Sequence, residues 1–177
     1  MYDEVDELLE ERERFWPDAD PCWSAIGARI IRIARYLDED RATRLEQFGV
    51  TSVEFDMLMV LRHFGGDEAA MRPSQIADKL LLSRTRSTVR VDGLVDRHLV
   101  DRFGDPSNRR QVVVQLSPLG HDLLDRAFGA YQGGLRELLS PMPKASHDEL
   151  VNLLRGVLEG VQERSHLNGV RCEATAY

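Results

Sequence analysis

The sequence has little cysteine and no long apolar run, and each absence excludes a class of protein. The chain of 177 residues has two cysteines, Cys22 and Cys172, too far apart for a disulfide framework or a cysteine metal cluster. No apolar stretch reaches the roughly 18 residues that a membrane helix needs, and the acidic start at residues 1–4 is unlike a secretory signal. We therefore expect a cytoplasmic protein without a membrane partner.

The sequence also lacks the motifs that mark common enzyme sites. It has no glycine-rich phosphate loop, no zinc-protease pair of histidines around a glutamate and no serine nucleophile elbow. Its five histidines are not spaced as metal ligands. We expect no catalytic residue, no metal site and no cofactor, so the chain is not predicted to be an enzyme.

Lysine is scarce as well, and the positive charge is carried by arginine in one region. The chain has a net charge of −7, which by itself argues against nucleic acid. Residues 72–110, however, hold nine Lys or Arg against five Asp or Glu. A local basic patch on an acidic body is typical of a nucleic-acid contact surface that the total charge conceals.

Apolar periodicity and turn residues predict a mainly α-helical protein with one small β-hairpin. Proline and glycine punctuate the helical pattern, and the hydroxyl residues Thr51, Ser83 and Ser117 are suited to cap helix starts. The period changes from helix to strand after residue 97, around a polar turn at residues 104–108. Helices are expected over residues 3–14, 24–48, 51–65, 73–80, 84–97, 117–139 and 146–164, and strands over 99–103 and 112–116.

This order of elements predicts a winged helix-turn-helix between two helical regions. We expect N-terminal helices over residues 1–50, the winged helix-turn-helix over 51–116, C-terminal helices over 117–165 and a flexible tail over 166–177. The apolar stripes of the terminal helices favour a helical dimerisation region.

The second helix of the predicted helix-turn-helix carries the residue types of a DNA-reading helix. Such a helix places its first turns in the major groove, where arginine pairs with guanine and hydroxyls bond to bases or phosphates. An arginine at the tip of the wing can enter a narrow minor groove. The predicted DNA contacts are Ser74, Ser83, Arg84, Thr85, Arg86, Ser87, Thr88, Arg90, Arg109 and Arg110.

Several local motifs resemble the MarR family of winged-helix regulators, over residues 20–158. The most specific is the wing sequence Asp-Pro-Ser-Asn-Arg-Arg at residues 105–110, followed by a valine-rich strand and Leu-Ser-Pro-Leu-Gly at 116–120. Similar motifs lie at residues 54–58, 73–77, 82–92 and 99–102. The resemblance implies a homodimer whose terminal helices pair and whose two winged helices bind double-stranded DNA at a palindromic operator.

The acidic extra helix at residues 3–14 is similar to the branch of that family that responds to small anions such as urate or trans-aconitate. The resemblance implies an effector site in which Asp56 matches the aspartate of that branch. The arginine position falls on His63, with Arg62 beside it, and the tryptophan position falls near Arg12. A second interpretation is that Asp56 and Arg62 form an ion pair and that His63 is a boundary residue.

Cys22 also has two interpretations. It follows Pro21 at the expected start of a long helix, where the helix dipole can lower the pKa of a thiol. Peroxide-sensing members of the family place a reactive cysteine nearby, supported by tyrosines, whereas this chain has Val53 and Phe55 in the supporting helix. Cys22 is therefore either a packed small apolar residue or the sensor of an oxidant-responsive repressor.

These observations predict a homodimeric DNA-binding transcription regulator. The first hypothesis is a repressor that a small anionic effector releases from its operator, and the second is the thiol-based repressor that uses Cys22. A third hypothesis, from another class, is a winged-helix module that binds proteins instead of DNA. The basic start of the second helix favours DNA.

Overall fold

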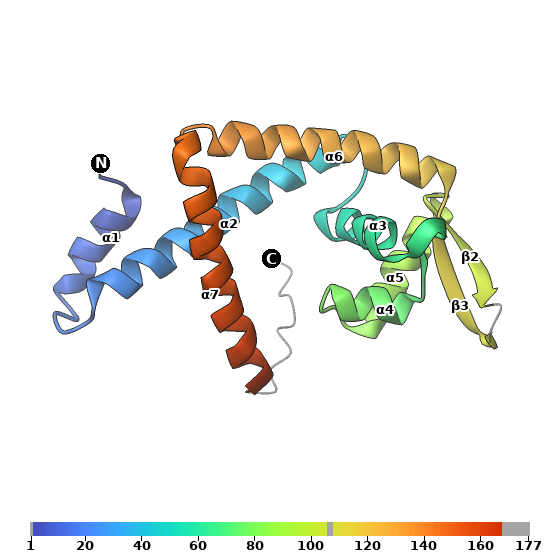
Figure 1. Cartoon of the computed structure of the whole chain (residues 1–177), viewed down its shortest axis with the longest axis horizontal. Helices are drawn as coiled ribbons and strands as arrows, with labels where there is room; N and C mark the ends of the chain where they lie inside the picture. The colour runs from blue at the N-terminus through green and yellow to red at the C-terminus, as the bar shows by residue number, and fades with distance from the viewer. Residues whose placement is uncertain (1, 106–107, 168–177) are drawn as a thin grey trace. The chain divides into compact units, whose positions relative to one another are not determined.

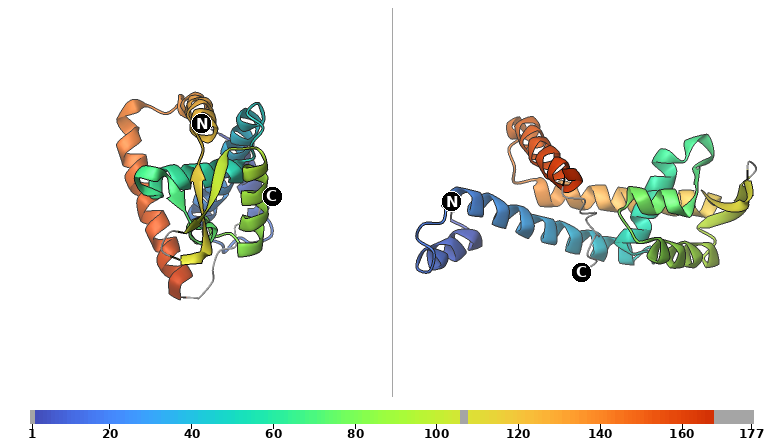
Figure 2. Two further views of the ribbon diagram at one scale, coloured as in Figure 1. Left: turned by 90° about the vertical axis from the view of Figure 1, so that its right-hand side faces the viewer. Right: turned by 90° about the horizontal axis from the view of Figure 1, so that it is seen from below.

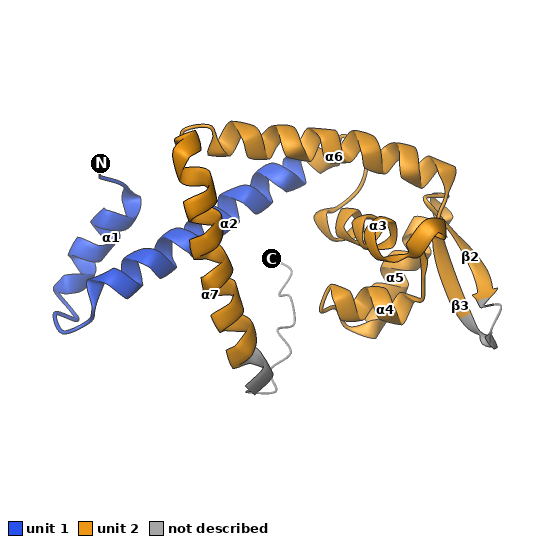
Figure 3. Cartoon of the chain, viewed as in Figure 1, with its two compact units in different colours: residues 1–43 blue, residues 44–177 orange. Residues whose placement is uncertain are grey.

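The computed structural model describes the backbone of residues 2–105 and 108–167, and the side chains of residues 2–104 and 112–164. The chain divides into two compact units, residues 1–43 and 44–177, each of which is described by itself (Figure 3). Most of the expected tail at 166–177 lies outside the described residues. None of the helices in the described part contains a stretch long and apolar enough to cross a bilayer.

The first unit consists of α1 (Glu4–Glu13) and most of α2 (Pro21–Glu46). Asp3 caps α1 in a reciprocal capping box with Asp6. The long helix begins at Pro21, three residues before the predicted start near Ser24, because proline suits the first turn of a helix, where its missing N–H is not needed.

Ion pairs hold α1 on α2. Arg29 of α2 contacts Asp3 at 2.9 Å and Asp6 at 2.6 Å, and Arg32 contacts Glu4 at 3.1 Å. Val5 is the only buried hydrophobic residue that the described part of this unit contributes. The acidity of the first helix therefore has a structural partner in the arginines of the second.

In the residues that the structure describes, five α-helices begin in the second unit, and Figure 1 labels them α3 to α7. Their starts agree with the predicted caps: Thr51 caps α3, Ser83 caps α5 and Ser117 caps α6, each accepting a backbone N–H of the first turn. The helices are α3 (Ser52–Phe64), α4 (Pro73–Lys79), α5 (Arg84–Asp96), α6 (Pro118–Leu139) and α7 (His147–Leu167).

The predicted hairpin belongs to a three-stranded antiparallel sheet of order β1-β3-β2. The strands β2 (Val100–Asp105) and β3 (Asn108–Leu116) pair from Val100–Leu116 down to Gly104–Val112. The third strand, β1 (Ala70–Met71), lies between the predicted helices 51–65 and 73–80, where no strand was predicted, and it pairs with Gln115 and Val114 of β3. The hairpin extends beyond α4 and α5 at one end of the unit (Figure 2).

The core of the second unit lies where α3, α4, α5 and the sheet meet. Of the apolar residues whose spacing predicts an inward face, Ile76 and Ala77 of α4 and Val91 and Leu94 of α5 are buried, whereas Leu80 and Val95 are half-buried. Further buried residues come from every neighbouring element: Leu45, Phe55, Met57, Leu58, Leu61, Val100, Val114, Leu123 and Leu124. The core fixes the orientation of α5, and therefore decides which of its residues face solvent.

Candidate nucleic-acid interface

The helices α4 and α5 form the expected helix-turn-helix, joined by residues 80–83. Leu81 has a positive φ of 55° in this turn, and the N–H of Leu82 donates to the carbonyl oxygen of Ala77 at 2.9 Å. This left-handed step ends α4 and starts α5 in a new direction, because the helical hydrogen-bond ladder cannot continue through it.

The first turns of α5 present the predicted contact residues to solvent. Ser83, Arg84, Thr85, Arg86 and Thr88 are exposed. Ser83 accepts the N–H of Arg86, and the hydroxyl of Thr88 donates to the carbonyl oxygen of Arg84 at 3.0 Å. The structure thus gathers two guanidinium groups and three hydroxyl-bearing side chains at one helix end. Ser74, near the start of α4, is half-buried.

Ser87 does not share this exposed surface. Its side chain is only 1% exposed, and its hydroxyl donates to the carbonyl oxygen of Pro73 at 3.2 Å. Ser87 lies four residues before Val91 and seven before Leu94, so it occupies the inward stripe of α5. This hydrogen bond joins α5 to the start of α4. The prediction that Ser87 is one of the solvent-facing DNA contacts is therefore corrected.

Two later arginines of this region turn toward the start of α3. Arg90 of α5 lies 3.5 Å from the hydroxyl of Thr51. Arg97 donates to the carbonyl oxygen of Gly49 and to the carboxylate of Glu54, both at 2.5 Å. Glu54 in turn accepts the N–H of Thr51 at 2.8 Å. These bonds fasten α5 to the segment that leads into α3.

Among the described side chains, an ion pair between Arg102 of β2 and Asp92 of α5 connects the wing to that helix. Arg109 and Arg110 were predicted at the tip of the wing, before a strand over 112–116, whereas β3 already begins at Asn108 and includes both. Their side chains lie outside the described residues. The described geometry therefore supports the position of the wing beside α5, and the contacts of its tip stay a prediction.

The electrostatics of α5 run against the usual helix pattern. The positive end of a helix dipole, at the N-terminus, favours acidic side chains, and each misplaced charge costs about 0.3–1 kcal/mol. The first turn of α1 holds three acids, whereas that of α5 holds none and carries Arg84 and Arg86. No carboxylate is paired with Arg84 or Arg86 among the described side chains. This end of α5 is therefore suited to bind an anionic partner.

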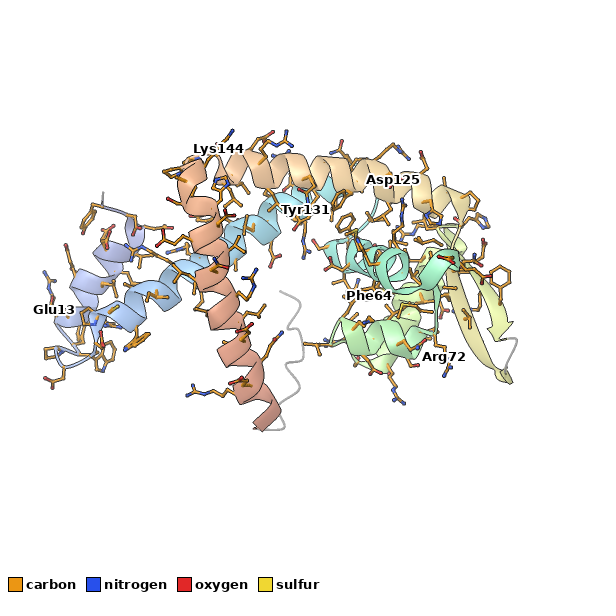
Figure 4. The ribbon with its side chains drawn as sticks, in the orientation of Figure 1. Glu13, Phe64, Arg72, Asp125, Tyr131 and Lys144 are labelled. Carbon is orange, nitrogen blue, oxygen red and sulfur yellow. The ribbon has the colours of Figure 1, made fainter. Side chains whose placement is uncertain are left out.

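The predicted effector residues are distributed over both units. In the second unit, Arg62 pairs with Asp125 of α6 at 3.1 Å and lies 3.1 Å from Nδ1 of His121. His63 lies 2.8 Å from the carbonyl oxygen of Met59, one turn earlier in its own helix. Asp56 is half-buried. Arg62 is thus paired with a carboxylate of another helix. Figure 4 labels that residue, Asp125, on α6.

Arg12 and Cys22 belong to the first unit. Arg12 donates to the hydroxyl of Ser24 and lines a cavity of about 470 Å³ together with Trp16 and the acids Asp6, Glu10 and Glu13. Three carboxylates beside one guanidinium disfavour an anion in that cavity. Cys22 is exposed, so the interpretation of it as a packed apolar residue is wrong for this chain.

Sequence reasoning did not single out three residues of this region. Arg97 and Arg102 were counted only as part of the basic region, although each makes an ion pair that positions α5. Val89 was not considered, yet it is 66% exposed on α5. The exposure of Val89 could have been predicted from the sequence. Val89 lies two residues from both Ser87 and Val91, and therefore on the opposite side of the helix from these buried residues.

Comparison with known proteins identifies the family. A model of the MarR family matches residues 48–111. The uncharacterized HTH-type transcriptional regulator YhbI of Bacillus subtilis is 30% identical over 124 residues, which cover 68% of this chain and 78% of that protein. The chain belongs to the MarR family. Its relatives are transcriptional regulators, which agrees with the prediction that it is not an enzyme.

Other relatives of this MarR-family chain match a larger share of it. The HTH-type transcriptional regulator PecS of Dickeya dadantii is 27% identical over 153 residues, 86% of this chain and 92% of that protein. A crystal structure of mutant MarR from E. coli, complexed with operator DNA, has a TM-score of 0.65 at 23% identity and covers 75% of this chain. The mainly helical fold with a small antiparallel sheet is therefore confirmed.

Proposed function

We propose that this MarR-family chain is a homodimeric transcriptional repressor that binds double-stranded DNA at a palindromic operator. The observation that carries the proposal is the outward face of α5, where Arg84 and Arg86 stand exposed at the helix start. The core residues Val91 and Leu94 hold the opposite face of that helix inward. A helix supported in this way can enter the major groove with its cationic end against bases and phosphates.

The other predicted DNA contacts fit the same surface. Ser83, Thr85 and Thr88 add hydroxyls to it, and Arg109 and Arg110 on the wing would reach the flanking minor groove or its phosphates. Ser74, in the first turn of the preceding helix, would bond to a phosphate in this proposal. The guanidinium group of Arg90 lies 3.5 Å from the hydroxyl of Thr51. Arg90 can contact DNA only if this hydrogen bond breaks.

The proposed dimer follows from apolar faces that the single chain leaves uncovered. On α7 a continuous stripe is 37–63% exposed and consists of Leu150, Leu153, Leu154, Val157, Leu158 and Val161. On α2, Ile26, Ile30 and Ile33 are also exposed. Contiguous apolar surface of this kind on a small protein marks an interaction site. A second copy of the chain is the occupant that we propose, because two-fold symmetry would match the two halves of a palindrome.

We further propose that a small anionic effector releases the repressor, as in the urate- and trans-aconitate-responsive branch. The described cationic group for this role is Arg62, with His63 beside it and Asp56 on the same helix. An anion would compete with Asp125 for Arg62, and so would change the tie between α3 and α6. Such a ligand shifts the protein between two states only by its difference in affinity for them. Arg12, in the other unit, remains a predicted contact without support from the described cavity.

The DNA-binding proposal is tested by reversing the charge at the start of α5. The double variant Arg84→Glu, Arg86→Glu is expected to lose measurable operator binding by fluorescence anisotropy. Its stability should rise by about 0.3–1 kcal/mol for each substitution, because acids suit the positive end of a helix. Wild-type affinity should fall with salt with a log–log slope of about −0.9 for each phosphate neutralised.

The control is Arg14→Glu, which makes one such charge reversal at an exposed residue of the first unit. It should leave both affinity and salt slope unchanged. Retention of wild-type affinity by the double variant, or salt-independent binding of the wild type, would refute the proposal. Because the double variant should bind DNA less and yet be more stable, a loss of binding cannot be attributed to a loss of fold.

A further inference from the structure

The exposed face of α5 has an apolar centre. Val89 is 66% exposed, which exceeds the 63% of Leu153 on the uncovered face of α7. At 100° for each residue of a helix, Val89 lies almost directly opposite the centre of the buried stripe formed by Ser87, Val91 and Leu94. Val89 therefore marks the line along which α5 projects farthest from the core.

One turn before and one turn after Val89, the residues on this line are small and uncharged. Asp96 lies two turns after it, and Asp92, which pairs with Arg102, lies at the border of the line. Thr85 lies one turn before it and is exposed. Gly93 lies one turn after it, where an added Cβ would meet no atom within 4 Å. By the same rotation, Arg86 lies on one side of the line and Thr88 on the other. The small residues around Val89 thus allow α5 to approach another surface closely, and the positive charge of Arg86 lies at the edge of this face.

The chemistry of this centre selects one kind of contact within the major groove. The base edges there are hydrogen-bond donors and acceptors, with one apolar exception, the C5 methyl group of thymine. A β-branched apolar side chain at the most projecting point of the helix makes no hydrogen bond, and contact with a methyl group removes its apolar surface from water. The flanking cation would meanwhile face the phosphates at the rim of the groove.

We propose that Val89 is a specificity-determining residue that packs against the C5 methyl group of one thymine in each half-site of the operator. The inference rests on the proposed function, since it places α5 in the major groove. It adds what that proposal leaves open, namely a base identity that the protein reads by apolar contact.

The test uses the full chain and DNA that the protein itself selects from a random duplex library. Each thymine of the selected duplex is replaced singly by deoxyuridine, which lacks the methyl group and keeps the Watson–Crick edge. For one thymine in each half-site, the replacement should weaken wild-type binding about fourfold, and replacement in both half-sites about fifteenfold, the loss expected for one buried methyl-sized group at each.

Val89→Ala should bind the thymine and uracil duplexes equally, and its thermal unfolding should match the wild type because Val89 is exposed. Val89→Thr retains the β-branched shape and should lose part of the discrimination, which provides a second variant if alanine perturbs the helix. Arg86→Ala is the matched control: it should bind both duplexes more weakly and still discriminate about fourfold between them, because the methyl contact is intact.

The outcomes separate this inference from the proposed function. If the wild type selects no sequence and its binding is independent of salt, both fail. If selected DNA is bound with the expected salt dependence but no uracil replacement matters, or Val89→Ala discriminates as the wild type does, only the role of Val89 fails. A change of oligomeric state in Val89→Ala would also overturn it, since Val89 would then belong to a protein interface.

Discussion

Single residues decide how closely the second unit can pack around the start of α6. Ser117 is 5% exposed; its hydroxyl donates to the carbonyl oxygen of His98 at 2.6 Å and accepts the N–H of Gly120 at 2.9 Å. A Cβ built on Gly120 would lie 2.0 Å from the carbonyl oxygen of Leu99. Only glycine allows this close approach of helix and chain, because the obstacle is backbone and cannot rotate away.

Gly120→Ala is therefore expected to destabilise the fold by about 1–3 kcal/mol, the usual cost of inserting an extra carbon into a packed region. Gly129→Ala on the same helix is the control, since its added Cβ meets no atom within 4 Å. It should stabilise the protein by about 0.5–1 kcal/mol, because alanine is the better helix former. Urea unfolding at one protein concentration measures both, and equal effects of the two variants would contradict the packing argument.

At the scale of elements, the docking of α1 on α2 depends on charge more than on apolar contact. Val5 is the one buried hydrophobic residue in the described part of this unit, whereas Arg29 contacts both Asp3 and Asp6. The hydrogen bond from Arg29 lowers the pKa of Asp6 below the usual 3.8. Tyr2, just before α1, donates a hydrogen bond to Glu10 of that helix, and this bond raises the pKa of Tyr2 to about 12. The carboxylates of Asp3 and Asp6 at the start of α1 are thus paired with Arg29 of α2.

The pH dependence of this docking has a defined sign. Because the pKa of Asp6 is lowered in the folded state, its contribution to docking is present above pH 3.8 and is lost as the pH falls through the lowered value. Carbon-13 NMR titration of the Asp6 carboxyl should show its midpoint rising in Arg29→Ala. Arg35→Ala, on the same helix, should leave it unchanged. Identical midpoints in the wild type and Arg29→Ala would show that Arg29 does not hold Asp6.

At the scale of the whole molecule, charge and apolar surface are separated along the chain. The basic region at residues 72–110 contrasts with a net charge of −7, and the uncovered apolar stripe lies farther along, on α7. A contiguous exposed apolar stripe on a small protein marks a surface that binds a partner. The proposed dimer would cover it and would place two basic faces on one molecule.

Leu154→Asp tests this assignment by putting a charge in the middle of the stripe. It should shift the protein from dimer to monomer in sedimentation velocity at micromolar concentration, because burying an unpaired carboxylate is costly. Asn152→Asp is the control, since residue 152 lies on the opposite side of α7 and an aspartate there still accepts the hydrogen bond that Arg155 donates at 2.6 Å. If both variants sediment as the wild type does, the dimer does not use this face.

Local sequence signals predicted most of the fold. The caps at Thr51, Ser83 and Ser117 and the inward positions Val91 and Leu94 were read correctly, because a cap and a helical stripe depend on residues within a few positions of each other. The exposed start of α5 was predicted for the same reason. The strand β1 was missed because its two residues pair with β3 more than forty positions away, which no local pattern encodes.

The sequence by itself determined the order of the helices, the wing and the placement of basic residues at the start of α5. Only the tertiary structure decided that Ser87 is buried against Pro73, that Arg62 pairs with Asp125, and that Arg97 fastens α5 to the segment before α3. The physical reason is that helix formation, capping and turns are settled between near neighbours. The role of a polar side chain depends instead on which distant backbone or carboxylate the packed core brings within hydrogen-bonding distance.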